Sequence, residues 1–271
     1  MQRRNFVKAA ALAPVLAATE LAAASERDSI PAAPQEVYEW REYTFNFNSP
    51  LGVFEAYLKD ALMPALNRLG AKKIGVFRET GKSDPAKVCV LIPYSTLAAY
   101  AAVADGLAAD AEYQQKAAGF FALPPNPLPF LRLDTWLMTA FTGFPQMVLP
   151  KSGSRLFESR AYEGYSEDAV RRKVKMFNDA EFPIFDRVGL HSVFFGEVIA
   201  GKDMPRLAYL LAFKDMEERD KNWAAFLDDP DWKALLKDPQ YANTVSKIYK
   251  TFLVPTDYSQ QIGRASCRER V

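Results

Sequence analysis

Two short segments of the sequence carry the same set of side chains that could do chemistry. Residues 38–43 read Tyr-Glu-Trp-Arg-Glu-Tyr and residues 157–162 read Phe-Glu-Ser-Arg-Ala-Tyr, so both follow the pattern aromatic-Glu-x-Arg-x-Tyr. Alternate side chains of a β-strand point to the same face. If both segments are strands, each carries a polar row on one face: Glu39, Arg41 and Tyr43 in the first, and Glu158, Arg160 and Tyr162 in the second.

The two polar rows admit two interpretations. Charged side chains removed from water need partners, so Glu and Arg can pair across strands while Tyr completes the network. Alternatively, Arg41 or Arg160 binds an anionic or carbonyl ligand through its planar guanidinium, and Tyr43 or Tyr162 donates a further hydrogen bond. A paired Glu whose pKa is raised by burial would then be available as a general base. Pairing is the simpler interpretation, and both rows remain candidate ligand-binding positions.

The other residue types narrow the chemistry. The sequence has a single histidine, His191, which excludes a multi-histidine metal site, and we predict no metal. A hydrogen-bonded structural histidine is the default, with an axial haem ligand or a proton shuttle as the alternative. Asp134 and Trp136 alternate with apolar residues in the segment 131–141 and are further candidates for lining a cavity. We predict no bound cofactor, haem being the alternative.

Cysteines and aromatic residues give mainly structural signals. Cys89 lies in the apolar run 88–92 and is expected to be a buried, inert thiol. Together with Cys267 it provides no disulfide framework. Trp223, Phe226 and Trp232 recur at roughly helical spacing and are expected to belong to a core rather than to a ligand cage.

The polar rows belong to a repeat that spans most of the chain. Glu39 and Glu158 are 119 residues apart, and the same shift relates a further set of residues. The shift pairs Pro64 with Pro183, Arg68 with Arg187, Gly70 with Gly189, Leu91 with Leu210, Asp110 with Asp229 and Tyr113 with Trp232. Because matches at this one shift recur over more than seventy residues, from 39 to 113, we infer a tandem duplication.

Each copy predicts the same order of elements from its hydrophobic periodicity and turn residues. In the first copy we predict strands over 37–45, 74–77, 87–94 and 131–141, a helix over 51–69 that Gly70 ends, and an interrupted helix over 97–118. In the second copy we predict strands over 155–163, 192–199, 207–213 and 245–254, a helix from Ser166 to Gly189, and helices over 217–227 and 230–236.

The order β-α-β-β-α-β, written twice, predicts an α+β fold made of two ferredoxin-like repeats, over 35–145 and 155–261. Helices cover one face of each antiparallel sheet, and the two sheets can cover each other's second face. We therefore expect an intramolecular barrel with helices outside. In the second copy Phe157, Ser159 and Ala161 look like the helix-covered face, so both polar rows are expected to point into the barrel.

We expect neither end of the chain to belong to the folded domain. Residues 1–24 combine paired arginines, Arg3 and Arg4, with a short apolar run and an Ala-x-Ala-like end, which indicates a bacterial export signal of twin-arginine type. We expect an exported, periplasmic or extracellular protein with no stable membrane span once the signal is removed; an uncleaved membrane anchor is the alternative. Residues 262–271 look like translated sequencing adapter, so we treat them as a non-native tail and expect the natural C-terminus to be missing.

Composition excludes several classes of function. Hydrophobic residues make up 49% and charged residues 25% of the chain, as in ordinary globular proteins, and the formal net charge is +1. Such a balance gives no general attraction for nucleic acid, and we predict no nucleic-acid partner. The sequence contains no phosphate loop, dinucleotide fingerprint, nucleophile elbow or HExxH motif.

Three motifs together resemble the NIPSNAP family. They are the Glu-x-Arg-x-Tyr strand, the helix end Pro183-x-x-x-Arg187-x-Gly189, and Leu-Asp-Asp-Pro-Asp-Trp at 227–232. The resemblance covers roughly 35–261 and is stronger in the second half, because 109–113 lack the Pro and the Trp. It implies a dimeric α/β-barrel fold. It implies no settled reaction for bacterial members, although the wider superfamily includes small monooxygenases, haem-degrading enzymes and chlorite-dismutase-like haem proteins.

Two hypotheses about function follow. The first is an exported NIPSNAP-family protein of unassigned activity that holds a small ligand in the barrel interior. The second is a small oxygenase-like enzyme, cofactor-free or haem-dependent, that uses the barrel cavity. A filled interior would count against both, whereas a partly polar space of roughly 300 Å³ or more would support them. A scaffold that works by homo-oligomerisation is a third possibility, for which the sequence shows no interface signature.

Overall fold

The computed structural model describes residues 34–81 and 85–261, which belong to one compact unit. The predicted export signal, the predicted tail and Cys267 lie outside the described residues. Within them, each half contributes four strands. The strands are β1 (Val37–Phe45), β2 (Gly75–Glu79), β3 (Ala86–Tyr94) and β4 (Arg132–Ala140), then β5 (Leu156–Glu163), β6 (His191–Ala200), β7 (Arg206–Phe213) and β8 (Lys247–Pro255).

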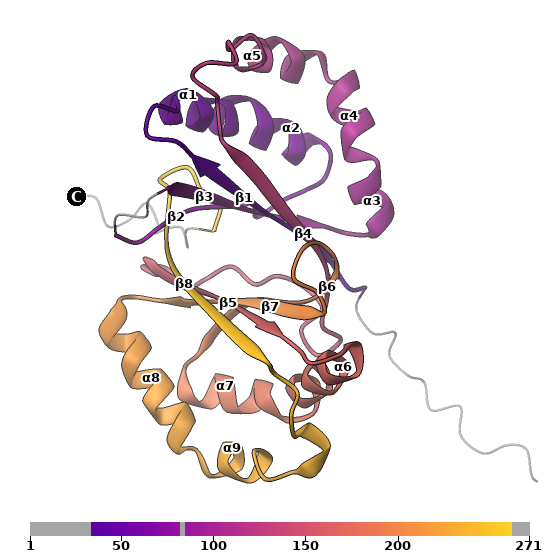
Figure 1. Ribbon diagram of the computed structural model, residues 1–271, viewed down its shortest axis with the longest axis vertical. Coiled ribbons are helices and arrows are strands. Elements are labelled where there is room, and N and C mark those ends of the chain that lie inside the picture. Colours follow the sequence, from indigo (N-terminus) through magenta and orange to yellow (C-terminus); the bar gives the residue numbers. More distant parts are fainter. Residues whose placement is uncertain (1–33, 82–84, 262–271) are drawn as a thin grey trace, which may run out of the picture. The chain divides into compact units, whose positions relative to one another are not determined.

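The helices also follow one order in both halves (Figure 1). The first half has α1 (Leu51–Ala56), η1 (Tyr57–Leu62), α2 (Met63–Arg68), α3 (Leu97–Ala101), α4 (Val103–Ala109) and α5 (Ala111–Phe121). The second half has α6 (Glu167–Met176), η2 (Phe177–Glu181), α7 (Phe182–Val188), α8 (Met216–Asp228), α9 (Pro230–Leu235) and the 3₁₀ turn η3 (Pro239–Tyr241). No helix in the described ranges is long and apolar enough to cross a membrane.

The eight strands form one closed antiparallel barrel in the order β1-β3-β2-β8-β5-β7-β6-β4. Within each half the order is that of a ferredoxin-like sheet: β4-β1-β3-β2 and β8-β5-β7-β6. Two seams join the halves, β2 with β8 (Phe77 opposite Pro255) and β4 with β6 (Leu137 opposite Ala200). The predicted fold is therefore confirmed. Closing the barrel pairs the sheet edges that each half alone would expose.

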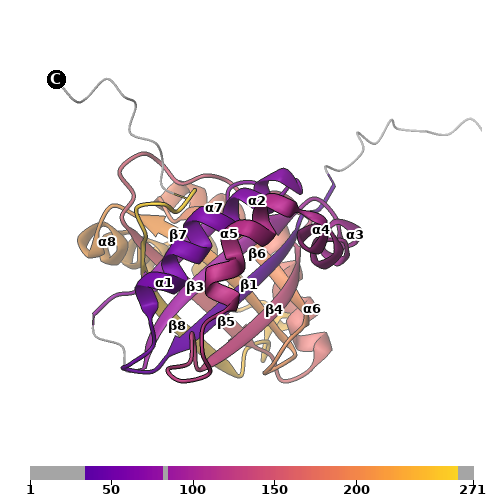
Figure 2. The ribbon, with the colours of Figure 1, turned by 90° about the horizontal axis from the view of Figure 1, so that it is seen from above.

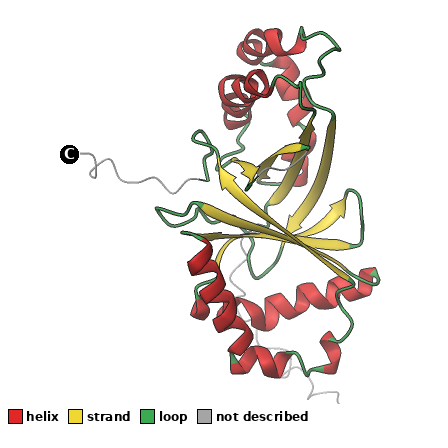
Figure 3. Cartoon of the chain, turned by 60° about the vertical axis from the view of Figure 1, so that its left-hand side comes forward, coloured by secondary structure: helices red, strands yellow, loops and turns green. Residues whose placement is uncertain are grey.

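Helices cover the outside of the barrel (Figures 1 and 3). In the view of Figure 2, α1, α2 and α5 lie over strands β1, β3 and β4 of their own half. Three buried clusters result: one under the helices of the first half, one under those of the second, and one inside the barrel. The interior cluster includes large aromatic side chains, among them Tyr38, Trp40, Phe77, Phe157 and Phe194.

The long helix of each half contains a π-helical segment, which the sequence analysis missed. The segments η1 and η2 lie just before Pro64 and Pro183. Because proline has no amide hydrogen and clashes with the carbonyl four residues earlier, an α-helix cannot pass it unchanged, and a wider turn accommodates the break. The helix of the second half begins with the Ser166 hydroxyl accepting from the Ala169 amide and ends at Gly189 in the left-handed conformation (φ 76°), as its sequence predicts.

Candidate functional site

The two polar rows lie on the helix-covered outer face of the barrel, not inside it. Phe157 belongs to the interior cluster, whereas Tyr162 packs under the helices of the second half. In the first half, Tyr38 and Trp40 point inward and Tyr43 packs under helices. The prediction that the rows line the barrel interior is therefore wrong. Since β1 and β5 are buried on both faces, hydrophobicity alone does not distinguish inside from outside.

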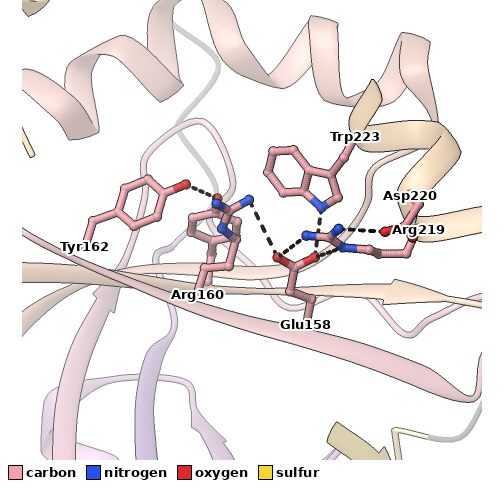
Figure 4. Close-up of polar contacts among 7 residues, drawn as sticks. Glu158, Arg160, Tyr162, Arg219, Asp220 and Trp223 are labelled. Atoms are coloured by element: carbon pink, nitrogen blue, oxygen red, sulfur yellow. Dashed lines mark hydrogen bonds and ion pairs between the residues drawn. The ribbon is translucent and has the colours of Figure 1, made fainter. Parts of the chain in front are cut away.

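Glu158 is the centre of a buried network under helix α8 (Figure 4). Its carboxylate is fully buried and accepts hydrogen bonds from Nε of Arg219 at 2.8 Å, Nη2 of Arg219 at 3.1 Å and Nε1 of Trp223 at 2.8 Å. Arg219 also binds Asp220 at the surface. The charge of Glu158 is thus matched by a guanidinium that approaches from the helix.

Arg160, the next residue of the row, is paired much more loosely. Arg160 is only 6% exposed, yet its ion pair is long, with Nη1 3.6 Å from Oε1 of Glu158. Its Nε has no hydrogen-bond partner among the described residues. The guanidinium carbon lies 4.0 Å from the ring centre of Trp223 and 5.5 Å from that of Tyr162. Arg160 is therefore a buried cation that is stabilised mainly by aromatic faces.

Two further polar pairs lie beside Arg160. Nζ of Lys173 donates to the carboxylate of Glu181, and both side chains are buried. Burial raises the pKa of Glu181 although the ammonium of Lys173 opposes that shift. The hydroxyls of Tyr162 and Tyr209 lie 2.6 Å apart, and burial raises the pKa of Tyr162 to about 12.

These side chains line a pocket of about 430 Å³ between the outer face of the second sheet and its helices, which we call the helix-covered pocket. Its volume lies within the range of small-molecule sites. Its mouth carries four exposed apolar side chains, Tyr165, Leu227, Leu236 and Ile248, which are 68%, 61%, 60% and 46% exposed. The walls include Arg160, Tyr162, Lys173, Met176, Glu181, Phe185, Tyr209, Trp223, Phe226, Trp232, Leu235 and Tyr241.

The equivalent place in the first half is packed differently. Glu39 accepts two hydrogen bonds from Arg41, at 2.7 and 2.9 Å, and a third from the hydroxyl of Tyr94 at 2.8 Å. Phe54, fully buried, packs against Tyr43 with ring centres 4.6 Å apart. In the first half the polar row is therefore internally paired, but Glu39 and Arg41 pair along one strand rather than across strands as expected, and the hydroxyl of Tyr94 supplies the bond from the neighbouring strand.

A second cavity, of about 230 Å³, lies inside the barrel, and we call it the axial cavity. Its volume is below the roughly 300 Å³ that drug-sized ligands need. Side chains of seven of the eight strands line it, so large interior residues fill only part of the barrel. The lining residues are Trp40, Glu42, Lys87, Cys89, Trp136, Met138, Ser159, Ala161, Phe194, Val198, Lys202, Asp203, Arg206, Ala208, Tyr249 and Thr251.

Asp134 lies on the interior-facing side of β4 and pairs with Lys202, 2.8 Å from Nζ, at the rim of the axial cavity. His191, by contrast, lines neither cavity. Its Nε2 is 3.3 Å from Nζ of Lys151 and 3.8 Å from Oε1 of Glu218, and burial together with Lys151 lowers its pKa. These surroundings do not fit an axial haem ligand. In the described ranges no group of three or more His, Cys, Asp or Glu side chains could hold a metal ion.

Sequence reasoning missed the charged residues that the helices supply. Lys173 belongs to the apolar stripe of Val170 and Phe177, and Arg219 precedes the buried Trp223 by four residues. Residues three and four apart share a helix face, so both charges had to face the sheet. A lysine or arginine inside an apolar stripe was the signal that the outer face of the sheet carries counter-charges.

Comparison with known proteins agrees with this fold. The NIPSNAP family model matches residues 157–260. A provisionally assigned monooxygenase from Lactobacillus acidophilus NCFM is 9% identical, with 82% of this chain and 94% of that chain covered and a TM-score of 0.55. A second such protein, from Fusobacterium nucleatum, is 7% identical, with coverages of 82% and 92% and a TM-score of 0.56. At these identities the likeness shows the fold alone.

An uncharacterised NIPSNAP-like domain protein from Burkholderia xenovorans is 20% identical over 40% of this chain and 90% of that chain, with a TM-score of 0.35. The chain matches no curated protein. The family match covers the half that contains the helix-covered pocket. The second half of the chain, residues 157–260, is therefore similar to the NIPSNAP family.

Proposed function

We propose that this protein binds a small amphiphilic monoanion in the helix-covered pocket of its second half. The observation that carries the proposal is Arg160: a guanidinium that is 6% exposed, lines the pocket and leaves Nε without a partner among the described residues. A buried charged donor without an acceptor is costly. A carboxylate or similar anion in the pocket would give this guanidinium the close ionic partner that Glu158, 3.6 Å away, does not supply.

The local balance of charges favours an anion. Glu158 is paired with Arg219, which donates to both carboxylate oxygens, and Glu181 is paired with Lys173. Arg160 shares Glu158 only at 3.6 Å. Three cations thus face two carboxylates in the buried part of the network, and the surplus charge belongs to Arg160.

The apolar surroundings define the rest of the ligand. Trp223, Phe226 and Trp232 form walls of the pocket, and the exposed Leu227 and Leu236 lie at its mouth. Exposed apolar side chains that gather around a concave site indicate that an apolar group covers them. We therefore place the anionic end of the ligand at Arg160 and its apolar body along these walls toward the mouth.

The second candidate is an oxygenase-like enzyme. It is supported by the fold shared with two proteins provisionally assigned as monooxygenases and by titratable pairs in the same pocket, Lys173 with Glu181 and Tyr162 with Tyr209. Perturbed titratable groups in a cleft are typical of catalytic sites and also of structural networks. Oxygen uptake above the uncatalysed rate with phenolic substrates, abolished in a Tyr162→Phe variant, would favour the enzyme.

The binding proposal is tested with octanoate and octanol, which share an apolar chain and differ in charge. Calorimetric titration of the wild-type chain should show saturable binding of octanoate and weaker binding of octanol. Arg160→Met should weaken octanoate binding about 10- to 100-fold, the effect of losing a charge-assisted hydrogen bond, and leave octanol unchanged.

Arg41→Met is the matched control, because Arg41 holds the equivalent position in the first half but is bonded to Glu39. It should leave the affinity for octanoate unchanged. Equal loss of octanoate binding in both variants would trace the effect to general destabilisation. Undiminished binding in Arg160→Met would refute the assignment of the anion site.

A further inference from the structure

The axial cavity is a second internal space, separated from the helix-covered pocket by strand β5. The polar row of β5, which includes Arg160, faces the helices. The residues between its members, Ser159 and Ala161, face the axial cavity. The two spaces therefore do not share their lining, and a ligand of one touches none of the residues that line the other.

The axial cavity lies where equivalent positions of the two repeats face each other. Glu42 and Ala161, Lys87 and Arg206, and Cys89 and Ala208 are each 119 residues apart, and all of them line it. The second repeat contributes alanine where the first contributes Glu42 and Cys89. The space inside the barrel thus results from small side chains on β5 and β7.

Arg206 supplies an unusual charge to this space. Its residue is 5% exposed, and its guanidinium carbon lies 5.3 Å from the ring centre of Trp136 and 5.2 Å from that of Tyr249. Its ion pair with Asp203 is long, 3.5 Å between Nη1 and Oδ2. Burial lowers the pKa of Arg206, because desolvation disfavours its charged form, although Asp203 opposes that shift.

The neighbouring cations of the rim are matched more closely. Nζ of Lys87 lies 3.0 Å from Glu42, and Nζ of Lys202 lies 2.8 Å from Asp134. Arg206 is therefore the cation of this cavity with the most capacity for an additional acceptor. The lining also includes the buried side chains of Trp40, Met138 and Phe194, which offer mainly apolar surface for contact with a ring.

We propose that the axial cavity binds a single-ring aromatic carboxylate, with its carboxylate on Arg206 and its ring against Trp40 and Phe194. An apolar cavity of about 150 Å³ is large enough to hold benzene, so about 230 Å³ admits one ring with a planar anionic substituent. The fork of an arginine matches a carboxylate in bidentate geometry. This site goes beyond the function proposed for the helix-covered pocket and does not depend on it.

The four tryptophans make the two sites separately observable. Trp40 and Trp136 line the axial cavity, and Trp223 and Trp232 line the helix-covered pocket. The full chain is labelled with 5-fluorotryptophan, its four fluorine resonances are assigned by single Trp→Phe variants, and benzoate is titrated. We expect saturable shifts of the Trp40 and Trp136 resonances with a Kd of about 1 mM, typical of a one-ring fragment.

Two variants test the site, and one serves as control. Ala208→Leu, which fills the cavity, should abolish the shifts of Trp40 and Trp136, and Arg206→Gln should weaken them about 10-fold or more. Arg160→Met should leave them unchanged. If a variant does not fold, the wild-type titration still decides the question. Shifts confined to Trp223 and Trp232, no shift of any resonance at 10-fold the expected Kd (about 10 mM), or undiminished shifts in folded Ala208→Leu would overturn the proposal.

Discussion

The buried pair of Lys173 and Glu181 offers a sharp test of why the second half carries charges under its helices. The repeat places Phe54 and Leu62 at the equivalent positions of the first half, 119 residues earlier, and both are almost fully buried. The first half thus already contains an apolar replacement for the pair. Lys173→Phe with Glu181→Leu copies that arrangement into the second half.

The expected magnitudes follow from burial. Glu181→Leu alone leaves the ammonium of Lys173 buried without its carboxylate, and Lys173→Phe alone leaves the carboxylate of Glu181 stranded. Each should lower the free energy of unfolding by about 3–5 kcal/mol, whereas the double variant should be neutral or more stable by about 1–4 kcal/mol. At about 2–4 °C per kcal/mol for a domain of this size, each single variant should melt about 6–20 °C lower.

The assay is a double-mutant cycle measured by urea and thermal unfolding, together with octanoate titration of the double variant. Coupling of several kcal/mol between the two positions is expected. Single variants that melt like the wild type, or a double variant that loses the sum of both, would refute the assignment of a buried, mutually dependent pair. A stable double variant that no longer binds octanoate would show that the pair is kept for the pocket rather than for stability.

The pair of Lys173 and Glu181 also makes the stability of the protein depend on pH, and the direction of this dependence follows from the pKa of Glu181. Burial raises the pKa of Glu181 in the folded state above its unfolded value near 4.5. Its contribution to stability is therefore fully present below about pH 4.5 and is lost as the pH rises through the folded pKa. The double variant lacks this group, so its stability relative to the wild type should increase as the pH is raised from about 4.5 toward neutrality.

Three further predictions concern the rest of the chain. Burial and Lys151 lower the pKa of His191 below 6.5, so stability should be lost as the pH falls from about 6.5 through the folded pKa. The imidazole C–H signals of this histidine in NMR report its pKa. His191→Gln should remove the corresponding slope of the urea midpoint against pH. Arg3→Lys with Arg4→Lys should block export, and normal secretion of that variant would exclude the twin-arginine route. Deletion of 262–271 should leave the melting temperature unchanged, and a large decrease would show that these residues contribute to the fold.

Much of the architecture could be predicted because it depends on local periodicity and on the repeat. The strand at 37–45 and the helix end at Gly189 follow directly from alternation and from a glycine stop signal. The π-helical segments could not be predicted in the same way, because an apolar stripe at three- and four-residue steps tolerates one wider turn. The prolines at 64 and 183 were the available sign that the long helix of each half is interrupted.

Whether the polar rows face the helices or the barrel interior could not be predicted from the sequence of β5 alone. Phe157, Ser159 and Ala161 are apolar or small, a pattern that also fits a face beneath helices. Small side chains instead suit a narrow barrel interior, where those of the opposite sheet occupy the space. Glu158 lies on the helix side because its partner Arg219 comes from α8, 61 residues later, a distance at which no local pattern reports pairing.

The two repeats share one topology but distribute their side chains in opposite ways. The first half closes its outer face with Tyr43 and Phe54 and sends the large Trp40 into the barrel. The second half opens its outer face around Arg160 and sends the small Ser159, the equivalent of Trp40, inward. This divergence agrees with our proposal of a binding site in the second half, the half whose residues 157–260 match the NIPSNAP family model, while the first half supplies the closing sheet of the barrel.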